Sequence, residues 1–223
     1  MTAAQPMAIR SHDPVDEDGR AFSTSDRLGY FDHLYDRSAD PYGLRTRWYE
    51  ERKRAVLMAS LPHPRYARAY EPACGAGELT IDLATRCDEV LASDFSDKAL
   101  ASARARAEGL ANVRFERHVL PAEWPSGEPP FDLIVVSELG YFLDAKAMAA
   151  LASCCERALA VDGVLVACDW RPYFAERALP TEAVHDAFAA IGLARSVRHD
   201  ESDFLLELWS RDPRSVAQRE GIT

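Results

Sequence analysis

The stretch EPACGAGELT (71–80) decides the fold of this chain. It follows a short segment typical of a β-strand and opens a segment typical of a helix. Gly75 and Gly77 allow the backbone to turn tightly and to come close to a bound ligand. The start of a helix also offers free backbone N–H groups and a positive dipole end. This stretch therefore predicts a turn that binds a phosphate or a carboxylate at the edge of a sheet.

Short apolar runs alternate with helix-like stretches from about residue 64 onward. The predicted strands are 67–72, 89–94, 113–118, 131–138, 163–170, 193–200 and 203–210. The predicted helices are 45–61, 78–87, 97–109, 144–159 and 181–192, and a proline-rich loop covers 121–130. Alternating strands and helices predict a mainly parallel sheet. The last two strands are separated only by Glu201 and Ser202, so they must pair antiparallel.

We therefore expect an α/β, Rossmann-like fold with a mostly parallel seven-stranded sheet and a terminal antiparallel strand. Residues 62–223 would form this single core domain. Residues 28–61, rich in aromatic side chains, are predicted to form an N-terminal helical cap, and residues 1–27 a flexible tail.

The length, charge and cysteine content of the chain argue against several classes of protein. The 223 residues suit one domain, and the net charge of −10 argues against a nucleic-acid partner. No apolar run is long enough to span a membrane, and the first residues do not resemble a signal peptide, so we expect a cytoplasmic protein. The five cysteines form no C-x-x-C pair, which predicts reduced thiols and no metal site.

Asp94 ends the second predicted strand, about 20 residues beyond the glycine turn, where an acid commonly binds the ribose hydroxyls of a nucleotide-like cofactor. Capping of the next helix is the alternative role. Thr80 stands where a dinucleotide fingerprint has its third glycine. That glycine allows close packing around a pyrophosphate, so its absence favours S-adenosylmethionine, which has none.

The motifs EPACGAGELT, LASDFSDKAL and FDLIVVSELGYFL resemble, in this order and spacing, the successive motifs of class I methyltransferases. The stretches DPYGLRTRWYEERKR, LPAEWP, SELGYFL and VRHDESDFLLELW resemble the nodulation protein S (NodS) family, whose founding members N-methylate a deacetylated chitooligosaccharide. The likeness extends from about Tyr30 to Ile222. It implies S-adenosyl-L-methionine as cofactor and a small-molecule acceptor, with an amine of an amino sugar as the first candidate.

The resemblance also implies a set of cofactor residues. They are Glu71, Ala73, Gly75 and Gly77 for the methionine part, Asp94 for the ribose, Phe95, His118 and Val119 for the adenine, and Ser137 at the end of the fourth strand. Many class I enzymes have an aspartate at the position of His118. A histidine that accepts a hydrogen bond from the adenine amino group must be neutral.

Glu138 follows the fourth strand, and in this fold that strand end faces the methyl group. We expect Glu138 to hold a protonated amine or to take its proton. Tyr35, Trp48, Tyr49 and Tyr141 are the expected substrate-binding residues, since aromatic faces suit sugar rings and cations. O-methylation of a hydroxyl and a non-catalytic cofactor-binding module remain alternatives, whereas a nicotinamide dehydrogenase is disfavoured. We expect a monomer or a weak homo-oligomer.

Overall fold

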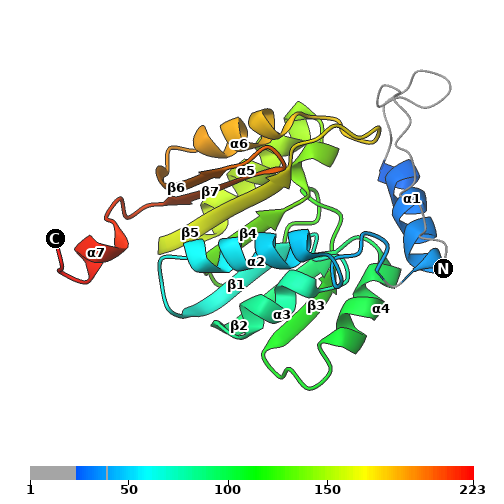
Figure 1. Ribbon diagram of the computed structural model, residues 1–223, viewed down its shortest axis with the longest axis horizontal. Helices are drawn as coiled ribbons and strands as arrows, with labels where there is room; N and C mark the ends of the chain where they lie inside the picture. The colour runs from blue at the N-terminus through cyan, green and yellow to red at the C-terminus, as the bar shows by residue number, and fades with distance from the viewer. Residues whose placement is uncertain (1–23, 39) are drawn as a thin grey trace.

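The computed structural model describes residues 24–38 and 40–223 (Figure 1). The predicted tail, 1–27, lies outside these residues except for its last four, which open helix α1 (Thr24–Arg37). The seven predicted strands are all present. They are β1 (Tyr66–Pro72), β2 (Cys87–Asp94), β3 (Val113–Arg117), β4 (Phe131–Ser137), β5 (Leu159–Trp170), β6 (Ala194–Asp200) and β7 (Phe204–Ser210).

The strands form one sheet in the order β3-β2-β1-β4-β5-β7-β6. The pairs among β1 to β5 are parallel, whereas β7 lies between β5 and β6 and is antiparallel to both. This confirms the Rossmann-like class and the terminal antiparallel strand. The order reverses between β1 and β4, and in open α/β sheets ligands bind beside the carboxyl ends of strands at such a point.

Helices cover both faces of the sheet (Figure 1). On one face, helices α2 (Trp48–Ser60) and α3 (Glu78–Ala84) pack leucines against β1, β4, β5 and β7, with α4 (Asp97–Arg106) beside them on β2 and β3. On the other face, α5 (Ala145–Ala158) and α6 (Thr181–Ala189) pack against the alternate strand residues. Strands buried on both faces explain the continuous apolar runs in the sequence.

Strand β5 begins at Leu159, earlier than the predicted residue 163. Asp162 and Gly163 are poor strand formers, which is why the sequence indicated a break there. The pairing with β4 shifts register between Phe131 and Leu133, so the extra residues are accommodated as an irregularity. The 3₁₀ turn η1 (Gly140–Phe142) and the short helix α7 (Val216–Arg219) had no sequence prediction.

The predicted cap, residues 28–61, comprises two parts with different surroundings. Helix α2 buries Leu57 and Leu61 in the main core, so it belongs to the layer that covers the sheet. Helix α1 stands apart from that layer, beside the carboxyl ends of the strands (Figure 1), and packs against α4. In the described part of the chain, no helix is long and apolar enough to cross a membrane. All five cysteines are free thiols.

Candidate active site

Backbone strain marks the carboxyl ends of two neighbouring strands. Among the described residues, Ala73 (φ 57°) and Glu138 (φ 58°) are the non-glycine residues with a left-handed backbone. Ala73 follows β1 and Glu138 follows β4, and these strands pair at the point where the order reverses. Such strain costs about 1–3 kcal/mol per residue and is concentrated at functional sites. The site predicted from the sequence therefore lies where the backbone departs from its preferred geometry.

The glycine turn after β1 has the expected conformation. Gly75 (φ +54°) and Gly77 (φ +81°) are both left-handed, and a Cβ on Gly77 would lie 3.1 Å from the Ala103 Cβ. Its amides are less free than the sequence suggested. The Gly75 N–H donates to Asp94 Oδ2 at 3.0 Å, and the Gly77 N–H donates to the Cys74 carbonyl at 2.9 Å. Part of the turn's donor capacity thus holds the turn itself together.

Asp94 is buried at the end of β2, directly beside this turn. Besides the Gly75 N–H, it accepts the Ser96 N–H on Oδ1 at 2.9 Å. Burial raises the pKa of Asp94, although these backbone donors act in the opposite direction. A carboxylate has about four acceptor sites, so both oxygens retain capacity for the hydroxyls of a ribose. The helix-capping role at α4 belongs to Ser96, whose hydroxyl accepts the Ala99 N–H.

Asp94→Ala should weaken the binding of both S-adenosylmethionine and S-adenosylhomocysteine by about 1.5–3 kcal/mol, the scale of a charged hydrogen bond. Titration calorimetry measures this, and NAD should not bind in either protein. Asp97→Ala, on the exposed first turn of α4, is the control. Because Asp94 also holds the Gly75 and Ser96 amides, thermal unfolding of the same variant and of Asp94→Asn checks that the turn is intact. Unchanged affinity in a folded Asp94→Ala protein would remove Asp94 from the cofactor site.

Glu71 is buried beneath the turn and accepts a hydrogen bond from the Thr80 hydroxyl at 2.5 Å. Burial raises the pKa of Glu71 to about 8, with Thr80 acting in the opposite direction. Glu71 is therefore mostly protonated at neutral pH. Thr80, which replaces the third fingerprint glycine, thus has a defined partner in this structure.

Binding of S-adenosylhomocysteine at pH 7 should release a proton from Glu71. The ammonium of the methionine part favours the ionised carboxylate and so lowers its pKa. Calorimetry at one pH in buffers of different ionisation enthalpy measures the number of protons released. Glu71→Gln should abolish the release. If the variant releases the same number of protons as the wild type, the proton comes from a different group.

The expected adenine residues meet beside Asp94. The backbone N–H of His118 donates to the backbone carbonyl of Asp94, and the ring atom His118 Nε2 lies 3.2 Å from Glu116 Oε2. His118 Nδ1 is buried and has no hydrogen-bond partner among the residues that the structure describes. An orphaned ring nitrogen at this position fits a hydrogen bond to a bound base. The Val119 N–H, in contrast, already donates to Glu123 Oε2 at 2.8 Å.

Phe95 and Ser137 complete the predicted cofactor set. Phe95 is partly exposed and contacts the Phe31 ring of α1, with 5.6 Å between ring centroids. It therefore lies between the cap helix and the end of β2. The Ser137 hydroxyl donates to the Cys168 carbonyl at 2.9 Å, which ties the ends of β4 and β5 together.

Glu138 is held on both carboxylate oxygens. Oε1 is 2.7 Å from Lys53 Nζ, and Oε2 accepts the Trp170 N–H at 3.0 Å as well as the Tyr141 hydroxyl. Its side chain is 29% exposed, so solvent still reaches it. The three donors hold the carboxylate in one orientation. The fourth strand therefore ends in a fixed carboxylate that already binds one ammonium group.

The four expected substrate-binding residues lie in different environments. Tyr141 is buried, and its hydroxyl donates to Glu138. Tyr49 packs edge-on to Trp170, and its own hydroxyl is buried with no hydrogen-bond partner in the described part of the chain. Tyr141 contacts Glu138 directly, and the centroid of the Tyr49 ring lies 5.3 Å from the Nζ of Lys53, the ammonium that Glu138 binds. Trp48 is 70% exposed at the start of α2. Tyr35 lies instead at the cofactor turn, with its hydroxyl 3.0 Å from the position of a Cβ on Gly75 and hydrogen-bonded to the Ala76 backbone.

Helix α1 bridges both halves of the site. Asp32 Oδ1 accepts the Ser96 hydroxyl at 2.6 Å, and Asp36 pairs with Lys98, also at 2.6 Å. Phe31 contacts both Phe95 and Phe142 of η1, and the ring centroids of Phe31 and Phe142 are 5.2 Å apart. Helix α1 is thus held by polar contacts with the start of α4 and by the side chains of Phe31 and Tyr35. Because it packs outside the layer that covers the sheet, we expect it to open and close.

Bound S-adenosylhomocysteine should slow tryptic cleavage after Arg37, at the end of α1, because a bound ligand adds contacts that hold the cap helix closed. Mass spectrometry of a digestion time course measures the rate. Cleavage after Arg219 in α7, at the far end of the chain, is the internal control. If the ligand leaves both rates unchanged, α1 is not a ligand-gated lid.

Sequence reasoning missed a second group of charged residues at the strand ends. Lys53 of α2 is buried and pairs with Glu138. Asp169 and His185 form a buried pair, with Asp169 Oδ2 3.2 Å from His185 Nε2. Because these partners are far apart in sequence, local patterns carry no signal for them.

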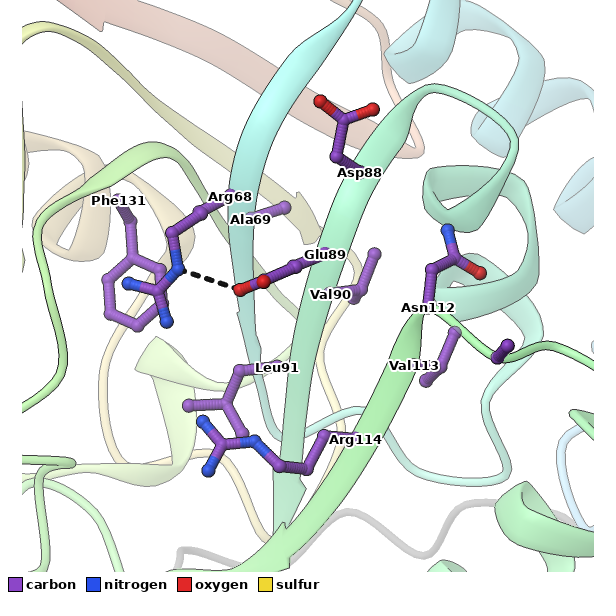
Figure 2. Close-up of a pocket in the computed structure, with 11 residues that line it drawn as sticks. Arg68, Ala69, Asp88, Glu89, Val90, Leu91, Asn112, Val113, Arg114 and Phe131 are labelled. Carbon is purple, nitrogen blue, oxygen red and sulfur yellow. Dashed lines mark hydrogen bonds and ion pairs between the residues drawn. The ribbon is translucent and has the colours of Figure 1, made fainter.

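A surface hollow of about 490 Å³ lies at the opposite end of the sheet, around the amino ends of β1, β2 and β3 (Figure 2). Its arginines are neutralised: Arg68 pairs with Glu89 at 2.9 Å and with Glu128 at 2.6 Å, and Arg114 pairs with Glu128 at 2.5 Å. Ligands of open α/β sheets bind at the carboxyl ends of the strands. The hollow is therefore no part of the candidate site.

Comparison with known proteins agrees with this geometry. Residues 69–163 match the family model of a methyltransferase domain. A Pseudomonas syringae protein described as a candidate methyltransferase is 45% identical, and the superposition covers 74% of this chain and all of that one, with a TM-score of 0.67. The N-methyltransferase NodS of Bradyrhizobium japonicum, in complex with S-adenosylhomocysteine, superposes with a TM-score of 0.74 over 84% of this chain and 98% of that chain, at 23% identity.

Among curated proteins, nodulation protein S of Rhizobium tropici is 33% identical over 47% of this chain. Nodulation protein S of Sinorhizobium fredii is 32% identical over the same share. The matched stretches span 43% and 48% of those relatives, less than half of their length.

The chain belongs to the class I methyltransferases that use S-adenosylmethionine. Within this class it resembles nodulation protein S. The described residues fit the cofactor: a glycine turn that a Cβ would crowd, the buried Asp94 and the orphaned His118 nitrogen lie together at the ends of β1, β2 and β3.

Proposed function

We propose that this protein transfers the methyl group of S-adenosylmethionine to a nitrogen of a small amine, with an amino sugar as the acceptor. One observation carries the proposal. The carboxylate of Glu138, at the carboxyl end of β4, already binds an ammonium group, that of Lys53, at 2.7 Å. A carboxylate that binds one ammonium at this position has the charge and the geometry to bind an acceptor ammonium in its place.

Two further observations support an amine. The net charge of −10 does not repel a cationic acceptor. The resemblance to nodulation protein S adds support for a sugar amine, because the related Bradyrhizobium structure carries the name N-methyltransferase.

For methyl transfer, the protein has to align the acceptor with the methyl group and to provide a proton acceptor. Bound S-adenosylmethionine supplies a methyl group that its sulfonium has already activated. The acceptor amine arrives mostly protonated, without a free lone pair, so its ammonium must first lose a proton. Glu138 would attract the ammonium and accept that proton. The aromatic side chains of Tyr49, Tyr141 and Trp170 would exclude water from the reacting atoms.

The test is a comparison of free and blocked amines. Glucosamine and N-acetylglucosamine share the same hydroxyls, but only glucosamine offers an ionisable nitrogen. We expect radiolabelled methyl groups to pass to glucosamine and not to N-acetylglucosamine, with mass spectrometry placing the methyl on nitrogen. Small amines and phenols extend the screen. If both sugars are methylated equally well, the site is directed to oxygen and the proposal is wrong.

A further inference from the structure

We infer that Lys53 occupies the acceptor's place on Glu138, and that Glu50 holds Lys53 when an acceptor ammonium takes that place. The inference rests on the proposed function, because it requires an amine acceptor at Glu138. It assigns a role in acceptor recognition to Lys53 and Glu50, two residues of helix α2 that do not themselves contact the reacting atoms.

The geometry shows one ammonium between two carboxylates. Lys53 Nζ lies 2.7 Å from Glu138 Oε1 and 3.0 Å from Glu50 Oε2. The side chains of Lys53 and Glu50 are only 8% and 13% exposed, whereas that of Glu138 is 29% exposed. Glu138 is therefore the member of the group that an incoming molecule reaches first, while Lys53 and Glu50 lie behind it.

The charges of this group are unbalanced in a way that suits an additional cation. One lysine and two glutamates leave one negative charge in a largely desolvated place. Asp169 and Arg177 carry opposite charges and also interact with Glu138, and Asp169 is itself paired with His185. An ammonium that binds Glu138 would complete the neutralisation of the three side chains, because Lys53 then needs only Glu50 as its partner. A buried lysine left without a partner would be costly, so Glu50 is what makes the exchange feasible.

The other carboxylate oxygen of Glu138, Oε2, keeps its contacts during such an exchange. Oε2 accepts the Trp170 N–H and the Tyr141 hydroxyl, so the carboxylate cannot turn away with Lys53. Only the contact of Oε1 with Lys53 has to open. The ring of Tyr49, with its centroid 5.3 Å from Lys53 Nζ, gives the displaced ammonium a second favourable contact on its own helix.

This arrangement favours acceptors that carry a positive charge. A cationic acceptor replaces the contact that Lys53 gives up with an equivalent one, whereas a neutral hydroxyl offers Glu138 a weaker bond than the ammonium it would displace. The resident lysine therefore favours amines over hydroxyls of the same shape. It does so without any contact of its own to the acceptor.

Glu50→Gln tests the inference. Without its second carboxylate, Lys53 stays on Glu138, so the KM for glucosamine should rise about tenfold or more while kcat changes by less than about twofold. Glu51→Gln, on the exposed side of the same helix, is the matched control and should change neither constant. Calorimetric binding of glucosamine to the S-adenosylhomocysteine complex should weaken by the same factor as KM rises.

Lys53→Met in the Glu50→Gln background provides the decisive rescue. It removes the competing ammonium, so the KM for glucosamine should return to or below the wild-type value. A KM that stays raised in the double variant, or that is unchanged in Glu50→Gln, would overturn the exchange while amine methylation itself stands. If the wild type methylates no free amine, the proposed function fails first, and this inference fails with it.

Discussion

Glu138→Gln should lower the turnover of an amine acceptor by about 10²–10⁴-fold, the contribution typical of a general base. Glutamine keeps the size of the side chain and the left-handed backbone of residue 138 imposes the same strain on either residue. It removes the negative charge that would attract the ammonium and the oxygen that would take its proton. The binding of S-adenosylhomocysteine should be unchanged, because Glu138 is not among the expected cofactor residues, of which only Ser137 shares its strand end.

The loss should be partly relieved at higher pH, since the acceptor then arrives with a free lone pair and no longer needs a base. Initial rates across a pH series, with cofactor affinity from calorimetry, measure both effects. Glu108→Gln, on the exposed surface beyond α4, is the control. A Glu138→Gln enzyme with wild-type turnover at neutral pH would show that the acceptor's proton leaves by another route.

His185→Ala should lower the free energy of unfolding by about 3–5 kcal/mol, the cost of leaving buried charges without their partner. The His185 side chain is 2% exposed and lies between two carboxylates. Its Nδ1 is 2.9 Å from Glu207 Oε2, and its Nε2 is 3.2 Å from Asp169 Oδ2. Glu207 also binds Arg195 and Arg198, but Asp169 would lose its nearest cation.

The same pair predicts a dependence of stability on pH. Burial by itself would lower the pKa of His185, but Asp169 and Glu207 outweigh burial and raise it. A raised pKa in the folded state means that the folded protein binds the proton more tightly than the unfolded chain. This contribution to stability is complete below the unfolded pKa of about 6.5 and is lost as the pH rises through the folded pKa.

Urea unfolding of wild type and His185→Ala across this pH range measures both predictions. The difference between the two proteins should be largest below pH 6.5 and should shrink as the pH rises. His33→Ala, on the exposed side of α1, is the control and should have little effect. Equal stability of the two proteins at low pH would show that the contacts with Asp169 and Glu207 give no net stabilisation.

The strands of the sheet show which features of the fold can be predicted from local sequence patterns. The sequence predicted β4, β5 and β7 most directly, because a strand buried on both faces requires a continuous apolar run and leaves a local signature. It predicted the antiparallel pairing of β6 and β7 because the short link allows no other. It could not predict that β7 lies between β5 and β6, since that depends on which edge of the sheet accepts the last hairpin.

The residues at the cofactor end of the site could also be predicted from the sequence. The glycine turn, Asp94 and the end of the third strand belong to successive strand–helix units, so their spacing along the chain reflects their spacing in the fold. The commitment of the Gly75 amide to Asp94, and the position of Tyr35 over the turn, were not predictable. They depend on the packing of α1 and the turn in three dimensions.

The sequence by itself determined the fold class, the turn at Gly75 and Gly77, and the carboxylates at the ends of β2 and β4, because each follows from backbone conformation and short-range periodicity. The tertiary structure alone decided which charges meet. Lys53 reaches Glu138 across 85 residues of sequence, and His185 meets Glu207 across 22. A long polar side chain on a helix leaves the same pattern whether it is solvated or paired in the interior. Only the packing of α2 and α6 on the sheet removes water from these groups and gives each its partner.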